Sequence, residues 1–187
     1  MFEKIYTKTA WDFDTAPLKI EYINENDIHQ KTLDKSDISV HLPLLQFLAR
    51  QCEKVVEFGV RGGNSTAAIL SGNPKSLLSV DINWHQADWI GDHPRWRFIQ
   101  SSSTNPNLDI GWPDMLFIDS LHEYEHCLME LKMWNKRVGR WICLHDTVSC
   151  PGVLQAMNEF LAENPKWFLA YDLKINHGFS ILQREYD

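Results

Sequence analysis

Short apolar runs alternate with segments of helical periodicity along most of the chain, and most of these runs end in polar residues. The runs expected as strands are residues 55–58, 76–81, 96–100, 114–119 and 140–146. The continuous apolar character of residues 114–119 and 140–146 is typical of parallel strands buried on both faces. Outside the runs, spacings of three and four predict amphipathic helices after Ser36 or Asp37, over residues 124–134 and after Pro151. Strands that alternate with helices require a mainly parallel sheet with right-handed crossovers.

The two ends of the chain differ from this pattern. Residues 167–171 and 179–182 are strand-like, which predicts a C-terminal antiparallel β-hairpin. Residues 1–36 show no clean period, and three interpretations remain open: a loose extension, a lid over the site, or an arm through which a homo-oligomer forms. The predicted fold class is α/β, with one doubly wound Rossmann-like sheet in residues 37–187 after an N-terminal extension, residues 1–36.

The first predicted strand ends in an acid and a glycine-rich bend. From Glu57 the sequence reads E-x-G-x-x-G-G, and Asn64 or Ser65 is the predicted N-cap of the next helix. The glycines are Gly59, Gly62 and Gly63. Free backbone N–H groups and the positive helix end converge above such a strand, and glycine lets a ligand approach the main chain. The dinucleotide fingerprint G-x-G-x-x-G fits poorly, so a tight turn without a ligand is the alternative.

A second carboxylate strengthens the ligand interpretation. Asp81 ends the second strand, 24 positions after Glu57, where an acid can accept hydrogen bonds from both hydroxyls of a ribose. Together the bend and Asp81 predict an adenosine-type cofactor. Trp84 follows closely, and we expect it either to pack on this cofactor or to belong to the core.

Polar residues also follow the later strands. These are the serine-rich loop 101–103, Asp119, and His145 with Asp146. The carboxyl ends of neighbouring parallel strands open onto one crevice, although a single polar residue there can simply cap the following helix. Two carboxylates from adjacent strands, Asp119 and Asp146, repel each other unless a cation or a shared proton lies between them.

Composition narrows the class of partner. The 187 residues suit one domain, and 25 acidic against 18 basic residues give a net charge of −7 without a basic cluster, which argues against DNA or RNA. No apolar run approaches the ~20 residues that a membrane span requires, and the first residues lack the apolar core of a signal peptide. Four cysteines without C-x-x-C spacing are typical of reduced thiols. We therefore expect a cytoplasmic protein.

The segment that follows the fourth strand carries a family resemblance. Residues 117–125 resemble the F-I-D-x-x-H-x-Y segment of class I S-adenosylmethionine-dependent methyltransferases, and the similarity extends through Trp134, residues 144–147 and residues 151–153. The subgroup resembled is the small-molecule O-methyltransferases related to macrolide-sugar and cephalosporin-tailoring enzymes. The resemblance covers about residues 53–183, and residues 1–36 lie outside it.

This resemblance implies where S-adenosylmethionine binds. Its methionine end would be lined by Glu57, Gly59, Gly62 and Gly63. Ser65 would lie near the methionine carboxylate, Asp81 would bind the ribose, and Ser102 in the loop 101–103 would border the adenine. Asp119 would face both the cofactor and a metal.

The resemblance also implies a metal and a base. Asp119 and Asp146 would hold a divalent cation, usually magnesium, and the neighbouring His145 is a candidate for a third ligand. The tailoring enzymes carry two consecutive acids where this chain has His145 and Asp146, and imidazole suits manganese, iron or zinc better than magnesium. His122 would be the general base, because imidazole has an unperturbed pKa of ~6.5 and the positive helix end is expected to keep the ring neutral.

A rival motif overlaps this base. Residues 122–126 read H-E-x-x-H, the zinc-protease pattern. However, no third ligand is present, and Met129 stands where the extended motif requires glycine, so we expect His126 to be a solvated helix residue.

The predicted function is therefore transfer of a methyl group from S-adenosylmethionine to a hydroxyl of a small molecule. The alternative is a module of the same fold that binds the cofactor or another nucleotide without turnover. The group of Asp119, His122 and Asp146 distinguishes the two, because cofactor binding alone does not require it.

Overall fold

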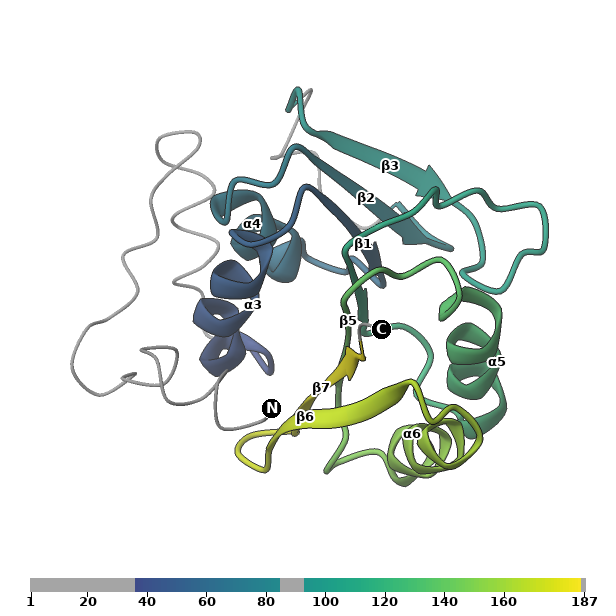
Figure 1. The fold of residues 1–187 in the computed structure, drawn as a ribbon. Helices are drawn as coiled ribbons and strands as arrows, with labels where there is room; N and C mark the ends of the chain where they lie inside the picture. The colour runs from purple at the N-terminus through teal and green to yellow at the C-terminus, as the bar shows by residue number, and fades with distance from the viewer. Residues whose placement is uncertain (1–35, 85–92, 186–187) are drawn as a thin grey trace.

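The fold is built around one seven-stranded sheet (Figure 1), in a computed structural model that describes residues 36–84 and 93–185. The strands are β1 (Lys54–Phe58), β2 (Ser76–Asp81), β3 (Trp96–Gln100), β4 (Met115–Ile118), β5 (Trp141–His145), β6 (Trp167–Leu173) and β7 (Phe179–Arg184). Their order is β3-β2-β1-β4-β5-β7-β6. Neighbours from β3 to β5 pair in parallel, whereas β7 is antiparallel to both β5 and β6. The predicted doubly wound sheet and C-terminal hairpin are confirmed.

Helices cover both faces of the sheet. They are the 3₁₀ turn η1 (Ser39–His41), α3 (Leu42–Ala49), α4 (Asn64–Ser71), α5 (Tyr124–Trp134) and α6 (Pro151–Glu163). α3 packs on α4 on one side of the sheet, and α5 packs on α6 on the other. Two buried apolar clusters follow from this arrangement, one on each face. Within the described residues, no helix is long and apolar enough to span a membrane.

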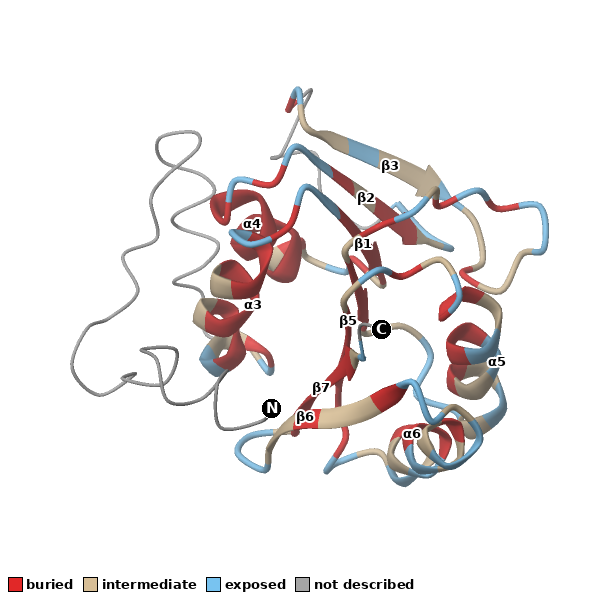
Figure 2. Cartoon of the chain, in the orientation of Figure 1, coloured by how far each residue is buried: buried red, intermediate tan, exposed pale blue. Residues whose placement is uncertain are grey.

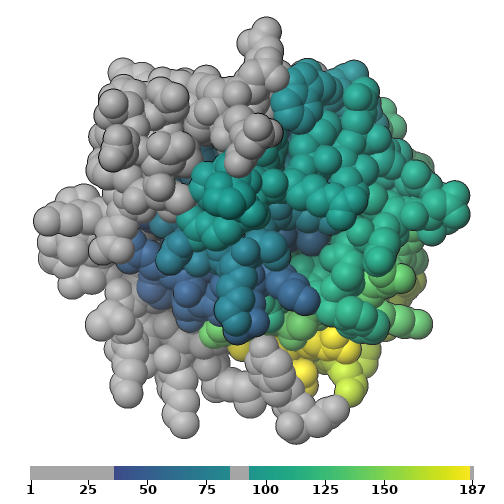
Figure 3. Space-filling model, turned by 90° about the horizontal axis from the view of Figure 1, so that it is seen from above, coloured from purple at the N-terminus to yellow at the C-terminus, as the bar shows by residue number. Residues whose placement is uncertain are grey.

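Burial is highest in the middle of the sheet. Figure 2 shows β1 and β5 mainly in red, whereas the edge strand β3 is tan and pale blue. Every residue of β4 and β5 is buried, as their continuous apolar runs predict. In the space-filling view, segments coloured from blue through teal and green to yellow meet on one face of the molecule (Figure 3).

The bend after β1 brings the ends of two strands together. Gly59 has a φ of +87°, and a Cβ atom there would lie 2.0 Å from the carbonyl oxygen of Asp119. Only glycine fits this close approach. Because strand order reverses between β1 and β4, the loops after these strands diverge and leave a crevice at the carboxyl edge of the sheet.

The start of α4 differs from the prediction. Its N-cap is Gly63, in the left-handed region with φ of 80°, and not Asn64 or Ser65. The reason is that the Ser65 hydroxyl donates to Glu57 and not to the helix backbone. Residues 1–35 lie outside the described residues, so the interpretations of the N-terminal extension stay predictions.

Candidate functional site

A cavity of about 460 Å³ opens at the carboxyl edge of the sheet. Its wall comes from segments at the ends of five strands: residues 59–61, 80–83, 101–103 and 119–122, and Asp146. Asp37 and His126 complete the wall from outside these loops. The cavity therefore joins the glycine bend, the acid of β2 and the polar ends of β4 and β5, as the sequence predicts.

Glu57 lies behind the bend and is not among the cavity residues. It is fully buried, and its carboxylate accepts hydrogen bonds from the hydroxyls of Ser65 (2.5 Å), Thr66 (2.7 Å) and Ser79 (2.6 Å). Burial raises the pKa of Glu57 to about 7, against the effect of these hydrogen bonds. Its visible role is to tie β1 to the start of α4 and to β2.

The predicted cofactor residues divide between the cavity and its support. Gly59, Asp81, Ser102 and Asp119 line the cavity, whereas Glu57, Gly62, Gly63 and Ser65 do not. Trp84 is also outside the wall; its ring lies edge-on to Phe98, with centroids 4.6 Å apart.

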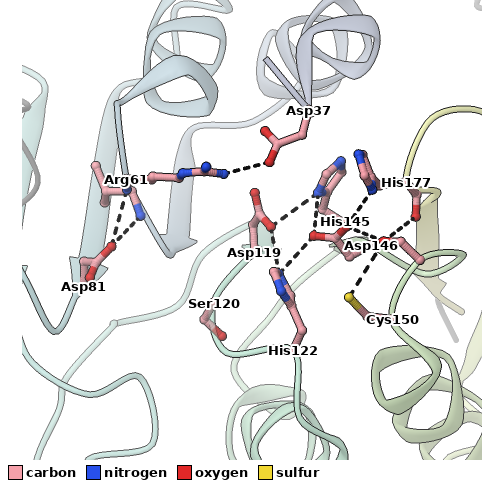
Figure 4. A network of polar contacts seen from close by, with 12 residues as sticks. Asp37, Arg61, Asp81, Asp119, Ser120, His122, His145, Asp146, Cys150 and His177 are labelled. Atoms are coloured by element: carbon pink, nitrogen blue, oxygen red, sulfur yellow. Dashed lines mark hydrogen bonds and ion pairs between the residues drawn. The ribbon is translucent and has the colours of Figure 1, made fainter.

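Asp81 holds the bend as well as facing the cavity. Its Oδ2 accepts hydrogen bonds from the backbone N–H groups of Val60 (2.8 Å) and Arg61 (3.4 Å) (Figure 4). Its Oδ1 accepts one from the backbone N–H of Asn83 (3.0 Å). The same carboxylate thus fixes the bend over the cavity and presents oxygen atoms at the end of β2.

Two carboxylates and two imidazoles converge at the ends of β4 and β5 (Figure 4). The Nε2 atom of His122 lies 3.3 Å from Oδ1 of Asp119 and 3.0 Å from Oδ2 of Asp146. The Nδ1 atom of His145 lies 3.3 Å and 3.1 Å from the same two oxygens. Each imidazole nitrogen therefore bridges both acids. The structure thus brings these four residues together at the ends of β4 and β5.

The mutual contacts set the charges of this cluster. Hydrogen bonds to Asp119 and Asp146 raise the pKa of His122 to about 10. Burial lowers the pKa of His145, but the same two acids outweigh burial and raise it to about 9. Burial would likewise raise the pKa of Asp119 and Asp146, yet hydrogen bonds from the two imidazoles hold both below their usual values. These contacts favour the charged form of all four side chains.

The contacts of His122 favour a protonated ring, whereas the sequence predicts a neutral one. α5 begins at Tyr124, so His122 precedes the helix. Two carboxylate oxygens within 3.3 Å outweigh the partial positive charge of a helix end, which is worth about half an elementary charge.

The loop after β5 is shaped around Asp146. This residue has a φ of +61°, a conformation that few residues other than glycine adopt. Its Oδ1 accepts a hydrogen bond from the Ser149 hydroxyl (2.6 Å) and lies 3.6 Å from Nδ1 of His177. The backbone carbonyl of His177 accepts hydrogen bonds from the N–H groups of Val148 (2.9 Å) and Ser149 (3.1 Å). The turn between β6 and β7 is thereby fastened to the cluster.

His177 was not among the site residues predicted from the sequence. It precedes β7, whose first residue Phe179 pairs with His145 of β5. The antiparallel register of β7 against β5 is the information that would predict a position for His177 near Asp146.

The donor set of the cluster fits a divalent metal. Ligand atoms of Asp119, His145 and Asp146 all lie within 4.8 Å of one another. A second group of His122, Asp146 and Cys150 meets the same limit and shares Asp146 with the first. Both groups combine oxygen with nitrogen or sulfur, a mixture that suits a transition metal better than magnesium.

His126 corrects a second expectation. It is not a solvated helix residue: its side chain is 22% exposed, it lines the cavity, and its Nε2 lies 3.1 Å from the Ser103 hydroxyl and 3.4 Å from Glu130. His122 contacts Asp119 and Asp146 instead. The two histidines of the H-E-x-x-H pattern therefore serve different partners, because only His126 belongs to α5.

Comparisons with known proteins agree with this geometry. Residues 56–147 match the family described as "Methyltransferase domain". The comparison with curated proteins gives no match.

Several solved methyltransferases share the fold at low sequence identity. The cofactor-bound Rv0187 from MTB is 17% identical, with a TM-score of 0.66 over 89% of this chain and 94% of that chain. The O-methyltransferase from Bacillus cereus in complex with SAH is 16% identical, with a TM-score of 0.66 over 99% and 100%. TomG, an O-methyltransferase from Streptomyces achromogenes involved in tomaymycin synthesis and solved with SAM, is 16% identical, with a TM-score of 0.61 over 87% and 92%. Residues 56–147 therefore resemble the methyltransferase domain family, and the fold of this chain is that of Rossmann-like methyltransferases.

Proposed function

We propose that this protein transfers a methyl group from S-adenosylmethionine to an oxygen of a small molecule. One observation carries the proposal: the cluster of Asp119, His122 and Asp146 opens onto the same cavity as Asp81 and the glycine bend. A cofactor site and a proton-handling site thus share one space. Structural neighbours solved with SAM or SAH support the cofactor.

The wall residues suggest how the cofactor is held. Asp81 accepts hydrogen bonds from the ribose hydroxyls, Gly59 leaves space beside the methionine end, and Ser102 borders the adenine. S-adenosylmethionine supplies a methyl group that is already activated on a sulfonium. The protein has to align an acceptor with that methyl group and make the acceptor oxygen nucleophilic.

The cluster of acids and imidazoles supports a divalent metal as part of the site. Asp119, His145 and Asp146 would be its ligands, and the nitrogen donor favours manganese over magnesium. A divalent cation bound there would lower the pKa of an acceptor hydroxyl and hold its oxygen.

Metal binding and base function are coupled through the same two acids. As long as Asp119 and Asp146 accept hydrogen bonds from His122, they keep its proton in place at neutral pH. If these carboxylates held a cation instead, His122 would lose the partners that raise its pKa.

Calorimetric titration with SAH tests the cofactor part of this proposal. We expect SAH to bind the wild type, and Asp81→Ala to weaken binding by about 1–3 kcal/mol, because a charged hydrogen-bonding group is lost. Asp109→Ala is a matched control, because Asp109 is exposed and lies outside the cavity wall. Binding of NAD or ATP without binding of SAH would refute the proposal.

The competing function is a module that binds the cofactor without turnover. Radiolabelled S-adenosylmethionine with a panel of hydroxylated small molecules distinguishes the two. Methyl transfer that requires Asp119, His122 and Asp146 supports the enzyme. Transfer that survives in all three alanine variants would show that the cluster has another purpose. A cytoplasmic location, the absence of a nucleic-acid partner and assembly through residues 1–36 remain predictions from the sequence.

A further inference from the structure

A buried acid lies behind another part of the cavity wall. Glu130 on α5 is fully buried. Its Oε1 accepts hydrogen bonds from the hydroxyls of Ser103 (2.5 Å) and Ser120 (2.6 Å), and the Nε2 of His126 lies 3.4 Å away. Its Oε2 has no hydrogen-bond partner in the described part of the chain. Burying a carboxylate is costly, so its presence behind the wall calls for a physical reason.

Glu130 determines which way two hydroxyl protons point. A hydroxyl has one proton to donate and two lone pairs that accept. Ser120 gives its proton to Glu130, so toward the cavity it can only accept a hydrogen bond. Ser103 gives its proton to the same oxygen, and one of its lone pairs faces His126. This part of the wall therefore presents hydrogen-bond acceptors.

The position of these serines relates them to one part of the cofactor. This step rests on the proposed function, in which the ribose lies at Asp81. The methyl group must lie toward His122, where a proton can be removed. The base of the nucleoside then takes the other direction, toward Ser103 and His126. Figure 4 shows the Ser120 side chain directed away from His145.

We propose that Glu130 is a positioning residue that makes Ser120 and Ser103 an acceptor site for the exocyclic amino group of adenine. The site then selects adenine over a base that carries a carbonyl oxygen at that position. A carbonyl oxygen would face lone pairs and would leave both groups without a hydrogen bond. Sites built to bind an N–H group reject analogues without it more strongly than apolar pockets reject a change of size.

A purely structural role for Glu130 is the alternative that the experiment must separate. The loop 101–103 is also held by the indole N–H of Trp134, which donates to the Ser103 carbonyl (2.8 Å). A structural role would change the affinity for every ligand by the same factor. A role in recognition changes the ratio between two ligands that differ at one group.

Calorimetry with SAH and S-inosylhomocysteine measures this ratio. The second ligand has a carbonyl oxygen in place of the adenine amino group. We expect the wild type to prefer SAH by about 10-fold or more. Ser120→Ala should weaken the binding of SAH more than the binding of S-inosylhomocysteine, and so reduce the preference for SAH. Glu130→Leu removes the acceptor of the Ser120 and Ser103 hydroxyls. Their protons can then turn toward the cavity, so the preference for SAH should narrow or reverse.

Two controls separate recognition from general damage. Asp81→Ala should weaken both ligands by the same factor, because the ribose is common to them. Ser101→Ala should also leave the ratio unchanged, since the Ser101 hydroxyl donates to the Ser102 carbonyl and not to Glu130. Circular dichroism reports whether each variant is folded. If Glu130→Leu does not fold, Ser120→Ala alone decides.

The outcomes distinguish this inference from the proposed function. If the wild type binds SAH but does not prefer it, or if Ser120→Ala and Glu130→Leu leave the preference unchanged, the assignment to Glu130 is wrong and the methyltransferase proposal stands. If the wild type binds neither ligand, both proposals fail together.

Discussion

Glu57 and Asp146 are both carboxylates near the carboxyl edge of the sheet, but their surroundings differ in one respect. Glu57, on β1, accepts hydrogen bonds from three hydroxyl groups and contacts no positive charge among the described residues. The effect of burial therefore dominates, and the pKa of Glu57 rises to about 7. Asp146, after β5, faces His122 and His145, which hold its pKa well below its usual range. One acid has neutral partners and the other has cationic ones.

The difference separates a supporting region from a reactive one. The hydroxyl groups around Glu57 donate hydrogen bonds to both of its oxygens and fix the start of α4. None of these partners is a cation that a metal ion could replace. The partners of Asp146 are protons on imidazoles, which a divalent cation can replace. Cationic partners, and not the acid itself, therefore mark the region where chemistry is expected.

The largest expected effect is on the reactive side. His122→Ala should lower methyl transfer by about 10²–10⁴-fold, the usual loss for a general base. Affinity for SAH should stay unchanged, because His122 contacts the acids of the cluster. Single-turnover methylation and calorimetry measure the two quantities.

His126→Ala is the matched control for this prediction. Its partners are Ser103 and Glu130, so we expect weaker SAH binding with little change in the methyl-transfer step at saturating cofactor. If the rate depends on His126 and not on His122, the assignment of the two histidines is reversed.

Glu57→Gln tests the supporting side through pH. The carboxyl pKa rises from its ordinary 4.5 to about 7 on folding, so the folded state holds this proton more tightly. The associated stability is complete below the unfolded pKa and is lost as pH rises through 7, a change of about 3 kcal/mol. Urea unfolding of the wild type should show this decline between about pH 4.5 and 7, and Glu57→Gln should flatten it.

The same experiment contains its own comparison. The pKa of His145 rises from 6.5 to about 9, so its contribution to stability is lost at higher pH than that of Glu57. Glu57→Gln should leave the decline above about pH 7 intact. Parallel curves for wild type and variant across the lower window would show that Glu57 is not the buried acid that responds.

Added metal should act on the reactive region alone. At a concentration 100 times its dissociation constant, manganese should stabilise the wild type by about 2.7 kcal/mol, and magnesium should stabilise it less. The effect should be smaller at acidic pH, because His145 must lose its proton before it can bind a metal. Thermal unfolding with and without each cation measures this.

Asp146→Asn provides the control. It should abolish the response to manganese and leave SAH binding largely intact, since Asp146 belongs to both candidate ligand groups. An equal metal response in wild type and variant would remove this cluster as the metal site.

Much of the fold could be predicted from local pattern. Buried parallel strands require apolar runs, and their order follows from helical crossovers, so residues 114–119 and 140–146 were recognisable without any long-range information. Asp119 and Asp146 could be placed together for the same reason, because neighbouring strands end at the same edge of the sheet.

The remainder depends on contacts between distant segments. Glu130 looks like an ordinary acid on the surface of a helix until α5 is packed against the loop 101–103. His177 reaches the cluster through the register of β7 on β5. The charge of His122 depends on its distances to two carboxylate oxygens, and these distances cannot be predicted from spacing in the sequence.

The smallest expected effect concerns Trp84, on the supporting side. Its ring packs on Phe98 and lies outside the cavity wall, so Trp84→Ala should change SAH affinity by less than about 2-fold, while lost ring contacts lower stability by about 1 kcal/mol. Trp112→Ala is the control, because Trp112 is more exposed, at 69% against 45% for Trp84, and should cost less stability. Calorimetry and urea unfolding measure the two effects. A 10-fold loss of SAH affinity in Trp84→Ala alone would place this ring on the cofactor and extend the reactive region to the end of β2.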